Sequence, residues 1–91
     1  MYLVSLRWLE TEMKPEMIDA VLGSLGDWFR FNGYTWFVWT DSTMWQVDIA
    51  VRARLTAKDS VLIIRVDPSE YAGIAPEWVW NWLKSKQQSP F

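Results

Sequence analysis

Four carboxylates stand where predicted strands begin or end, and they are the residues best suited to metal chemistry. They are Glu10, Asp27, Asp41 and Asp59. In the topology that we expect, these strand ends meet at one edge of a sheet, where carboxylate oxygens could bind Mg²⁺ and support phosphodiester chemistry. A simpler interpretation is that Asp41 or Ser42 caps a helix, while Asp27 and Asp59 occupy turns that favour aspartate. We favour this second interpretation and expect no metal site.

The composition excludes several other kinds of catalytic site. The 91 residues include no cysteine and no histidine. A disulfide, a thiolate nucleophile, a zinc site of the usual ligand sets and a histidine acid–base catalyst are therefore all ruled out. The seven serines have no base of the usual type to activate them, and no glycine pattern forms a phosphate-binding loop. We expect no cofactor and favour a protein that is not an enzyme.

A second group of candidate residues combines arginine with aromatic rings on the predicted sheet face that lies away from the helices. The group comprises Arg7, Trp28, Arg30, Phe37, Trp39 and Arg65. The C-terminal helix of the same chain, a second copy packed sheet on sheet, or single-stranded nucleic acid stacked on the rings could cover such a face. The net charge of −2 disfavours nucleic acid, because non-specific binding depends on a basic field. We expect a homodimer.

A β-hairpin in the stretch 27–41 should position most of these side chains. Asn32-Gly33, a strong hairpin signal, predicts strands over 28–31 and 34–40. If Asn32-Gly33 is a two-residue turn, Phe29 pairs with Trp36, and paired residues share a face. One predicted face, under the helices, carries Phe29, Phe31, Tyr34, Trp36 and Val38. The other carries Trp28, Arg30, Thr35, Phe37 and Trp39.

Periodicity predicts the remaining elements. Alternating or continuous apolar residues predict strands over 2–9 and 61–67, and helical spacing predicts helices over 15–25 and 43–55, with a third opening at Pro76. The order strand–helix–strand–strand–helix–strand indicates an α+β, ferredoxin-like fold with an extra C-terminal helix. We expect a four-stranded antiparallel sheet in the order 4-1-3-2, with the first two helices on one face.

The chain should form one domain over residues 1–84, followed by a polar tail over 85–91. In the last strand, we expect Leu62 and Ile64 to face the helices, because Arg65 belongs on the other side. No apolar run reaches the ~18–20 residues of a membrane span, and the N-terminus lacks the order of a signal peptide. We therefore expect a cytoplasmic protein with no membrane partner.

Several stretches resemble the small bacterial SinR-type proteins of unknown function. They are Tyr2-Leu-Val-Ser-Leu6, Leu25-Gly-Asp-Trp28, Val61-Leu-Ile-Ile-Arg-Val-Asp67, Tyr71-Ala-Gly-Ile74 and Trp78 through Lys84. That group is similar in fold to the smaller subunit of the CRISPR adaptation complex, which clasps double-stranded DNA, and to VapD-type ribonuclease toxins. The resemblance spans about residues 2–84 and implies a ferredoxin-like, dimeric scaffold.

The resemblance does not carry nuclease activity over. The nuclease relatives place an aspartate at the end of the first strand, whereas Arg7 and Trp8 stand there in this chain and Glu10 follows too late. We expect a non-catalytic interaction protein that homodimerises through the open face or edge of its sheet. The alternative is a nucleic-acid-binding or degenerate nuclease-like protein that uses Arg7, Arg30 and Arg65.

Overall fold

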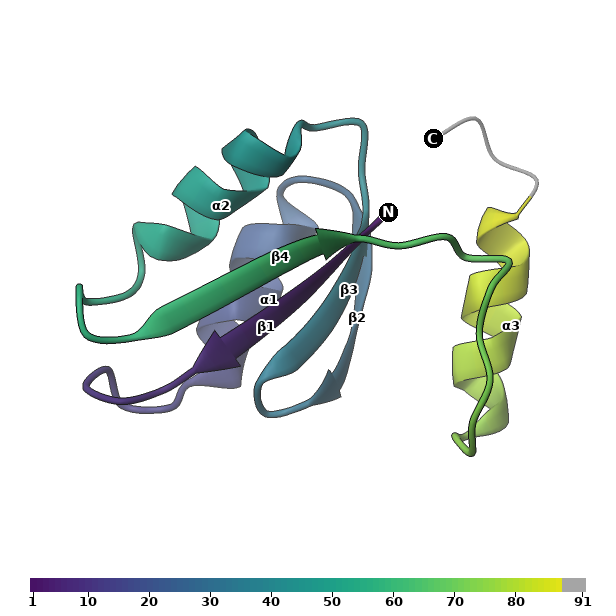
Figure 1. Ribbon diagram of the computed structural model, residues 1–91, viewed down its shortest axis with the longest axis horizontal. Helices are drawn as coiled ribbons and strands as arrows, with labels where there is room; N and C mark the ends of the chain where they lie inside the picture. The colour runs from purple at the N-terminus through teal and green to yellow at the C-terminus, as the bar shows by residue number, and fades with distance from the viewer. Residues whose placement is uncertain (88–91) are drawn as a thin grey trace.

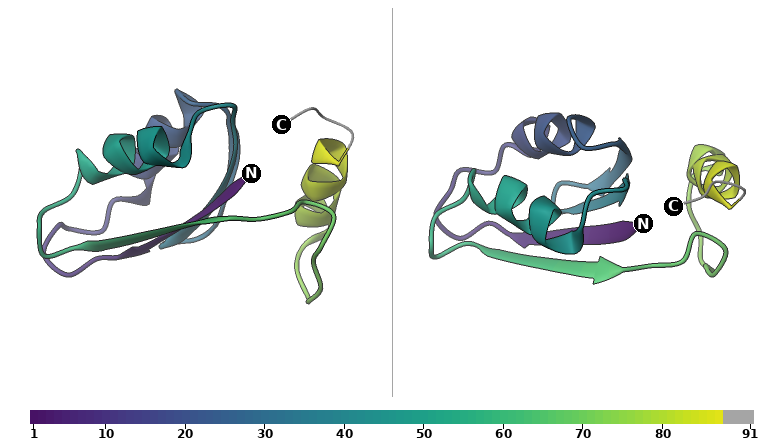
Figure 2. Two further views of the ribbon diagram at one scale, coloured as in Figure 1. Left: turned by 45° about the horizontal axis from the view of Figure 1, so that its top comes forward. Right: turned by 90° about the horizontal axis from the view of Figure 1, so that it is seen from above.

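The computed structural model describes residues 1–87, which form an α+β fold with a four-stranded antiparallel sheet and three helices (Figure 1). In chain order the elements are β1 (Tyr2–Arg7), α1 (Pro15–Gly23), β2 (Asp27–Asn32), β3 (Thr35–Trp39), α2 (Met44–Arg52), β4 (Ser60–Arg65) and α3 (Glu77–Lys86). The strand order is β2-β3-β1-β4, which reads 4-1-3-2 from the other edge. Helices α1 and α2 lie on one face of the sheet, and α3 stands beyond one end of it (Figures 1 and 2).

The main core lies between the sheet and the pair α1–α2. Its fully buried side chains are Val4, Ile18, Leu22, Trp36, Val38, Val47 and Val51. They recur at every second residue in the strands and three or four residues apart in the helices, so each element turns one apolar side inward. The buried Trp36 indole N–H donates a hydrogen bond to the Asp19 side chain on α1 at 2.8 Å. Without this partner the indole N–H would be a buried, unsatisfied donor.

Gly26 allows β2 to start directly beside the end of β3. A Cβ atom added at Gly26 would lie 2.1 Å from the carbonyl oxygen of Trp39, far inside van der Waals contact. Only a residue without a side chain fits this approach. Gly26 is therefore required by packing between two strands.

Helix α2 is capped by Thr43, not by Asp41 or Ser42 as the sequence had indicated. The Thr43 side chain accepts a hydrogen bond from the Gln46 amide at 3.2 Å, and the Gln46 side chain accepts one from the Thr43 amide at 2.8 Å. This reciprocal capping box satisfies two amides that a helix start leaves unpaired.

The hairpin register differs from the predicted one. Phe29 pairs with Phe37 rather than with Trp36, and Asn32 pairs with Thr35, so Gly33-Tyr34 forms the turn. A register irregularity follows Arg30, as a β-bulge would produce. Among the described residues only Gly73 has a positive φ, so Asn32-Gly33 does not form the type I′ turn, with two positive φ angles, that Asn-Gly favours in hairpins.

This change of register reverses the two faces of β2. Trp28 now shares a face with Val38 and the helices, whereas Phe29 shares a face with Phe37 on the opposite side. Helix α3 also extends further than predicted, because it includes Ser85 and Lys86, which we had placed in the polar tail. The end of that predicted tail, 88–91, lies outside the described residues.

Candidate functional site

The sheet face opposite α1 and α2, here called the open face, is the main candidate surface. Cross-strand pairing places there Leu3, Ser5, Arg7, Phe29, Thr35, Phe37, Trp39, Leu62 and Ile64. Phe31, which has no partner across the bulge, lines a groove on the same face. One row across all four strands is continuous and apolar, running Phe29–Phe37–Leu3–Ile64. Side chains that stand directly opposite one another in this way pack together as a unit.

The predicted group of arginine and aromatic side chains does not come together. Phe37, Trp39 and Arg7 lie on the open face as expected from their strands. Trp28 and Arg30 are on the helix side, because the register change reversed β2. The predicted placement of these two residues on the open face is therefore wrong.

Arg30 and Arg65 are both engaged on the helix side of the sheet. Arg30 is half-buried and lies 3.8 Å from Asp19 and 3.9 Å from Glu16, both on α1. Arg65 pairs with Tyr2 across the strands, where its guanidinium lies 5.4 Å from the ring centroid and donates to the hydroxyl at 3.3 Å. The prediction that Arg65 lies on the side of β4 away from the helices is wrong. Its long side chain extends along the sheet surface to Tyr2.

The four candidate carboxylates are divided between opposite ends of the sheet. Because β1 is antiparallel to both neighbours, the end of β1 lies beside the start of β4, which brings Glu10 and Asp59 to one end. Asp27 pairs with Trp39 at the other end, and Asp41 follows β3 there. The prediction that all four would meet is wrong, and the described residues contain no cluster of three or more acidic side chains that could hold a metal ion.

Asp59 has a structural role in joining two loops. Its carboxylate accepts hydrogen bonds from the backbone amides of Leu9, Glu10 and Thr11 at 2.8–3.1 Å and from the Thr56 amide at 2.9 Å. The Thr11 hydroxyl also donates to it. These donors, the Thr11 hydroxyl first, hold the pKa of Asp59 well below its usual range. Its oxygens are therefore engaged by the protein itself.

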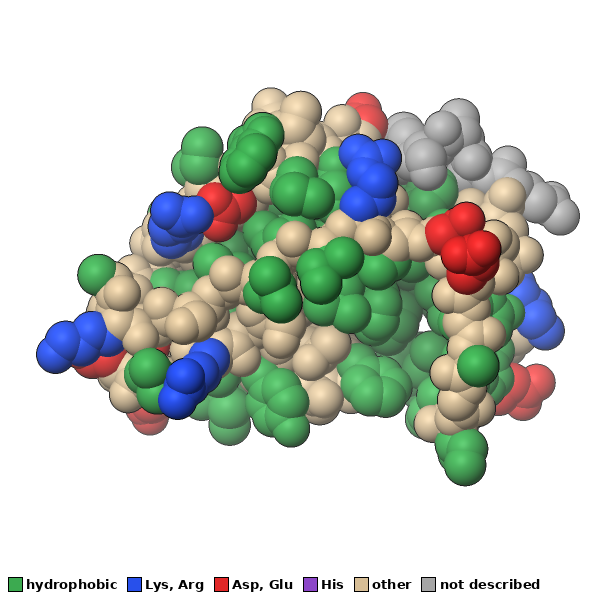
Figure 3. All heavy atoms as spheres, viewed as in Figure 1, with side chains coloured by type: hydrophobic (Ala, Val, Ile, Leu, Met, Phe, Trp, Pro, Cys, Tyr) green, Lys and Arg blue, Asp and Glu red, His purple; other side chains and the backbone are tan. Residues whose placement is uncertain are grey.

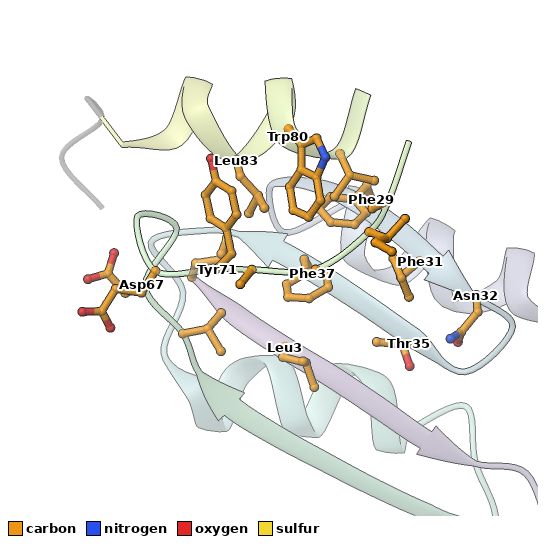
Figure 4. Close-up of a pocket in the computed structure, with 18 residues that line it drawn as sticks. Leu3, Phe29, Phe31, Asn32, Thr35, Phe37, Asp67, Tyr71, Trp80 and Leu83 are labelled. Carbon is orange, nitrogen blue, oxygen red and sulfur yellow. The ribbon is translucent and has the colours of Figure 1, made fainter. Parts of the chain in front are cut away.

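A groove runs between the open face and the segment that leads into α3 (Figure 4). It has a volume of about 540 Å³, with Leu3 and Phe37 on the sheet side and Tyr71, Trp80 and Leu83 on the opposite side. This volume falls in the range of small-molecule sites, and the lining is largely apolar and aromatic. Asn32 lies at one end of the groove and Asp67 at the other. Hydrogen bonds from the Ser69 amide and hydroxyl lower the pKa of the Asp67 carboxylate.

Helix α3 attaches to the sheet through a small second core. Its buried members are Met1, Phe29, Trp39, Val79 and Leu83. The Phe29 ring stacks on Phe37 with centroids 4.8 Å apart, and it meets Trp82 edge-on at 4.8 Å and Trp78 at 5.4 Å. Lys86 forms an ion pair with Asp27, which ties the last turn of α3 to β2. Helix α3 therefore packs against Phe29 and Trp39, at the end of the open face where β2 begins and β3 ends.

The β4 side of the open face stays uncovered. Leu62 is 58% exposed and Ile64 is 47% exposed, with the half-buried Leu3 beside Ile64. Figure 3 shows hydrophobic side chains across the middle of the molecule, where β4 runs nearest the viewer. We call Leu3, Leu62 and Ile64 the exposed patch.

The sequence prediction had placed four of the open-face residues on the wrong side of the sheet. These are Phe29, Phe31, Leu62 and Ile64. In β4 both sets of alternating residues are apolar, so alternation carries no information about which side faces the helices. In β2 the bulge near Phe31 exchanges the two faces, and Arg30 then lies within 4 Å of Asp19 and Glu16 on α1.

Comparisons of the chain with protein-family models, curated proteins and solved structures found no match.

Proposed function

We propose that this protein is a cytoplasmic, non-catalytic interaction protein with a ferredoxin-like fold that acts as a homodimer through its sheet. The order of the strands and of α1 and α2 supports the fold, as does their placement on a single face of the sheet. The resemblance to SinR-type proteins, whose relatives are dimeric, favours the same scaffold. Among the described residues no helix is long and apolar enough to cross a membrane.

The exposed patch is the observation that carries this proposal. Leu62 and Ile64 lie next to each other on one side of an edge strand, and each leaves about half of its side chain in water. Scattered apolar side chains are normal on a protein surface, but here two adjacent ones extend an apolar row, since Ile64 stands beside Leu3 at the end of the row that starts at Phe29. A second copy is the simplest partner, because a surface on a twofold axis needs only to complement itself.

The nucleic-acid alternative receives less support from the same surface. Stacking platforms need exposed rings next to cationic side chains. Arg30 and Arg65 bind side chains on the helix side, and Trp39 is buried beneath α3. On the open face, as far as the structure describes it, Arg7 alone remains as a cation.

Sedimentation velocity over a concentration series tests the homodimer. We expect a dimer for the natural sequence and a monomer for the double variant Leu62→Glu, Ile64→Glu, in which each charge would be buried at the contact. The matched control is Met13→Glu, Tyr34→Glu, whose side chains are 55% and 53% exposed and lie at the turn between β2 and β3, two strands away from β4. The control should remain dimeric, and circular dichroism should show all three proteins folded. A natural sequence that stays monomeric at every concentration would contradict the proposal.

A further inference from the structure

The two edges of the sheet differ in how well they are protected. The β2 edge carries the register irregularity, two charged residues, Asp27 and Arg30, and a helix that packs beside it. Bulges, charges and covering elements are the usual means by which proteins prevent an edge from pairing with another chain. β4, Ser-Val-Leu-Ile-Ile-Arg over residues 60–65, pairs regularly with β1 on its one occupied side and carries no bulge or proline, with its single charge at the last residue.

The direction of the β4 amides can be derived from one hydrogen bond. The Val66 amide donates to the Met1 carbonyl at 2.9 Å, so residue 66 points its backbone groups toward β1. In an antiparallel strand this direction alternates along the chain, so Ile64 and Leu62 also point toward β1. The N–H and C=O groups of Val61, Ile63 and Arg65 therefore point to the free edge, where the described sheet has no further strand.

We propose that this free edge pairs with the β4 edge of a second copy, antiparallel, to make one continuous eight-stranded sheet. This inference rests on the proposed homodimer and specifies its contact. The outward groups of Val61, Ile63 and Arg65 must meet outward groups of the partner, which permits only registers that pair these residues with odd-numbered ones. Two such registers keep the strands largely overlapped.

Charge selects between the two registers. When Val61 stands opposite the partner's Ile63, Arg65 comes near the partner's Asp59 at both ends of the contact. Asp59 keeps its hydrogen bonds to the loop amides and Arg65 its contact with Tyr2, so these opposite charges attract through space without a direct ion pair. When Ile63 stands opposite the partner's Ile63, Asp59 stands opposite the partner's Asp67, and two carboxylates meet instead. Like charges directly opposite in a sheet are destabilising, so the first register is favoured. It places Leu62 opposite the partner's Leu62 on the open face. The other register would place Leu62 opposite the partner's Ile64, so the exposed patches join in both registers and charge decides between them.

A second copy fits this edge better than an unrelated extended peptide does. The edge complements itself in backbone pairing, in the charges at its ends and in the apolar side chains at its centre. The same contact also covers Leu62, one of the two exposed apolar side chains of the strand. If the edge instead accepts a strand of another protein, the isolated chain is monomeric and the inference is wrong.

Residue-resolved amide hydrogen exchange tests the edge pairing without any substitution. In the dimer, the amides of Val61, Ile63 and Arg65 should become protected as concentration rises, while those of Leu62 and Ile64 are protected at every concentration. If a dimer forms but Val61, Ile63 and Arg65 exchange rapidly within it, the edge pairing is wrong and the homodimer stands. If the chain is monomeric throughout, both proposals fail.

The absence of cysteine from the chain permits a second, clean test of the register. Leu62→Cys should form an intermolecular disulfide readily, because its Cβ atom lies opposite its own copy in a non-hydrogen-bonded pair, where side chains are closest. Ile64→Cys is the matched control, on the same strand and face, and should cross-link at least tenfold more slowly because it faces the partner's Ser60. Equal rates for the two variants, or no cross-link at Leu62→Cys, would overturn the register.

Discussion

Replacement of Phe29 by alanine measures how firmly α3 is held on the sheet. Phe29 is 5% exposed, and its ring contacts Phe37 on β3 and both Trp78 and Trp82 on α3. The matched control is Phe31→Ala, the same substitution two residues further along the same strand, at a side chain that is 48% exposed. The two variants differ mainly in how much packing they remove.

The expected effects follow from this difference in burial. Deleting a buried phenylalanine side chain lowers the free energy of unfolding by about 3–5 kcal/mol, which includes the cavity left behind. At Phe31 roughly half of the ring is already in water and no closed cavity forms, so we expect a loss of about 1 kcal/mol. A domain of this size has a total stability of roughly 5–14 kcal/mol, so the first variant loses a large fraction of it.

Urea unfolding followed by tryptophan fluorescence measures both losses on the same protein. We expect the midpoint of Phe29→Ala to fall well below that of Phe31→Ala. Limited proteolysis adds a local readout, since release of α3 should expose the helix itself, residues 77–86, to cleavage in Phe29→Ala only. Equal losses for the two variants, with no new cleavage, would refute the packing of α3 against Phe29.

Two further substitutions test the loop and helix connections. Asp59→Asn should reduce the loss in free energy of unfolding that the natural protein shows at acid pH. The pKa of Asp59 is lower in the folded protein than in the unfolded chain, so below about pH 4 protons bind preferentially to the unfolded chain. The natural protein therefore loses stability as the pH falls, and the variant lacks this contribution. Urea midpoints between neutral pH and about pH 3 measure this, and identical slopes for variant and natural protein would count against it. Thr43→Ala should lower the free energy of unfolding by about 1 kcal/mol, through loss of the capping box, whereas Ser42→Ala should leave it nearly unchanged. A larger loss at Ser42 in the same unfolding assay would reassign the cap.

Much of the secondary structure could be predicted from local pattern. Pro15 marked the start of α1, and the apolar spacing of Ile18, Val21 and Leu22 marked its buried side. The alternation of Tyr2, Val4 and Leu6 correctly identified the core side of β1. These features are readable because each depends on residues a few positions apart, within one element.

The candidate site was only partly predictable, because it depends on which way two strands face. In β4 the residues on both sides are apolar, so the prediction of which side faces the helices depended on Arg65 alone. In the structure Arg65 contacts Tyr2 on the helix side, and Leu62 and Ile64 face the other way. In β2 one extra residue near Phe31 was enough to exchange the two sides. A shift by one residue moves every side chain of a strand to the opposite face, so a small local error changed the whole surface.

The sequence by itself determined which kinds of catalytic and metal site this protein cannot form, and most of the segments that become strands and helices. A chain without cysteine or histidine cannot form the common nucleophilic and zinc sites, whatever its fold. Tertiary structure decided the turn of the hairpin, where the Trp8 indole donates to the Gly33 carbonyl at 3.0 Å and the Leu6 amide donates to the Tyr34 carbonyl at 2.8 Å. These bonds join residues more than twenty positions apart. Local turn propensity cannot anticipate them, because they form only when β1 lies beside the hairpin.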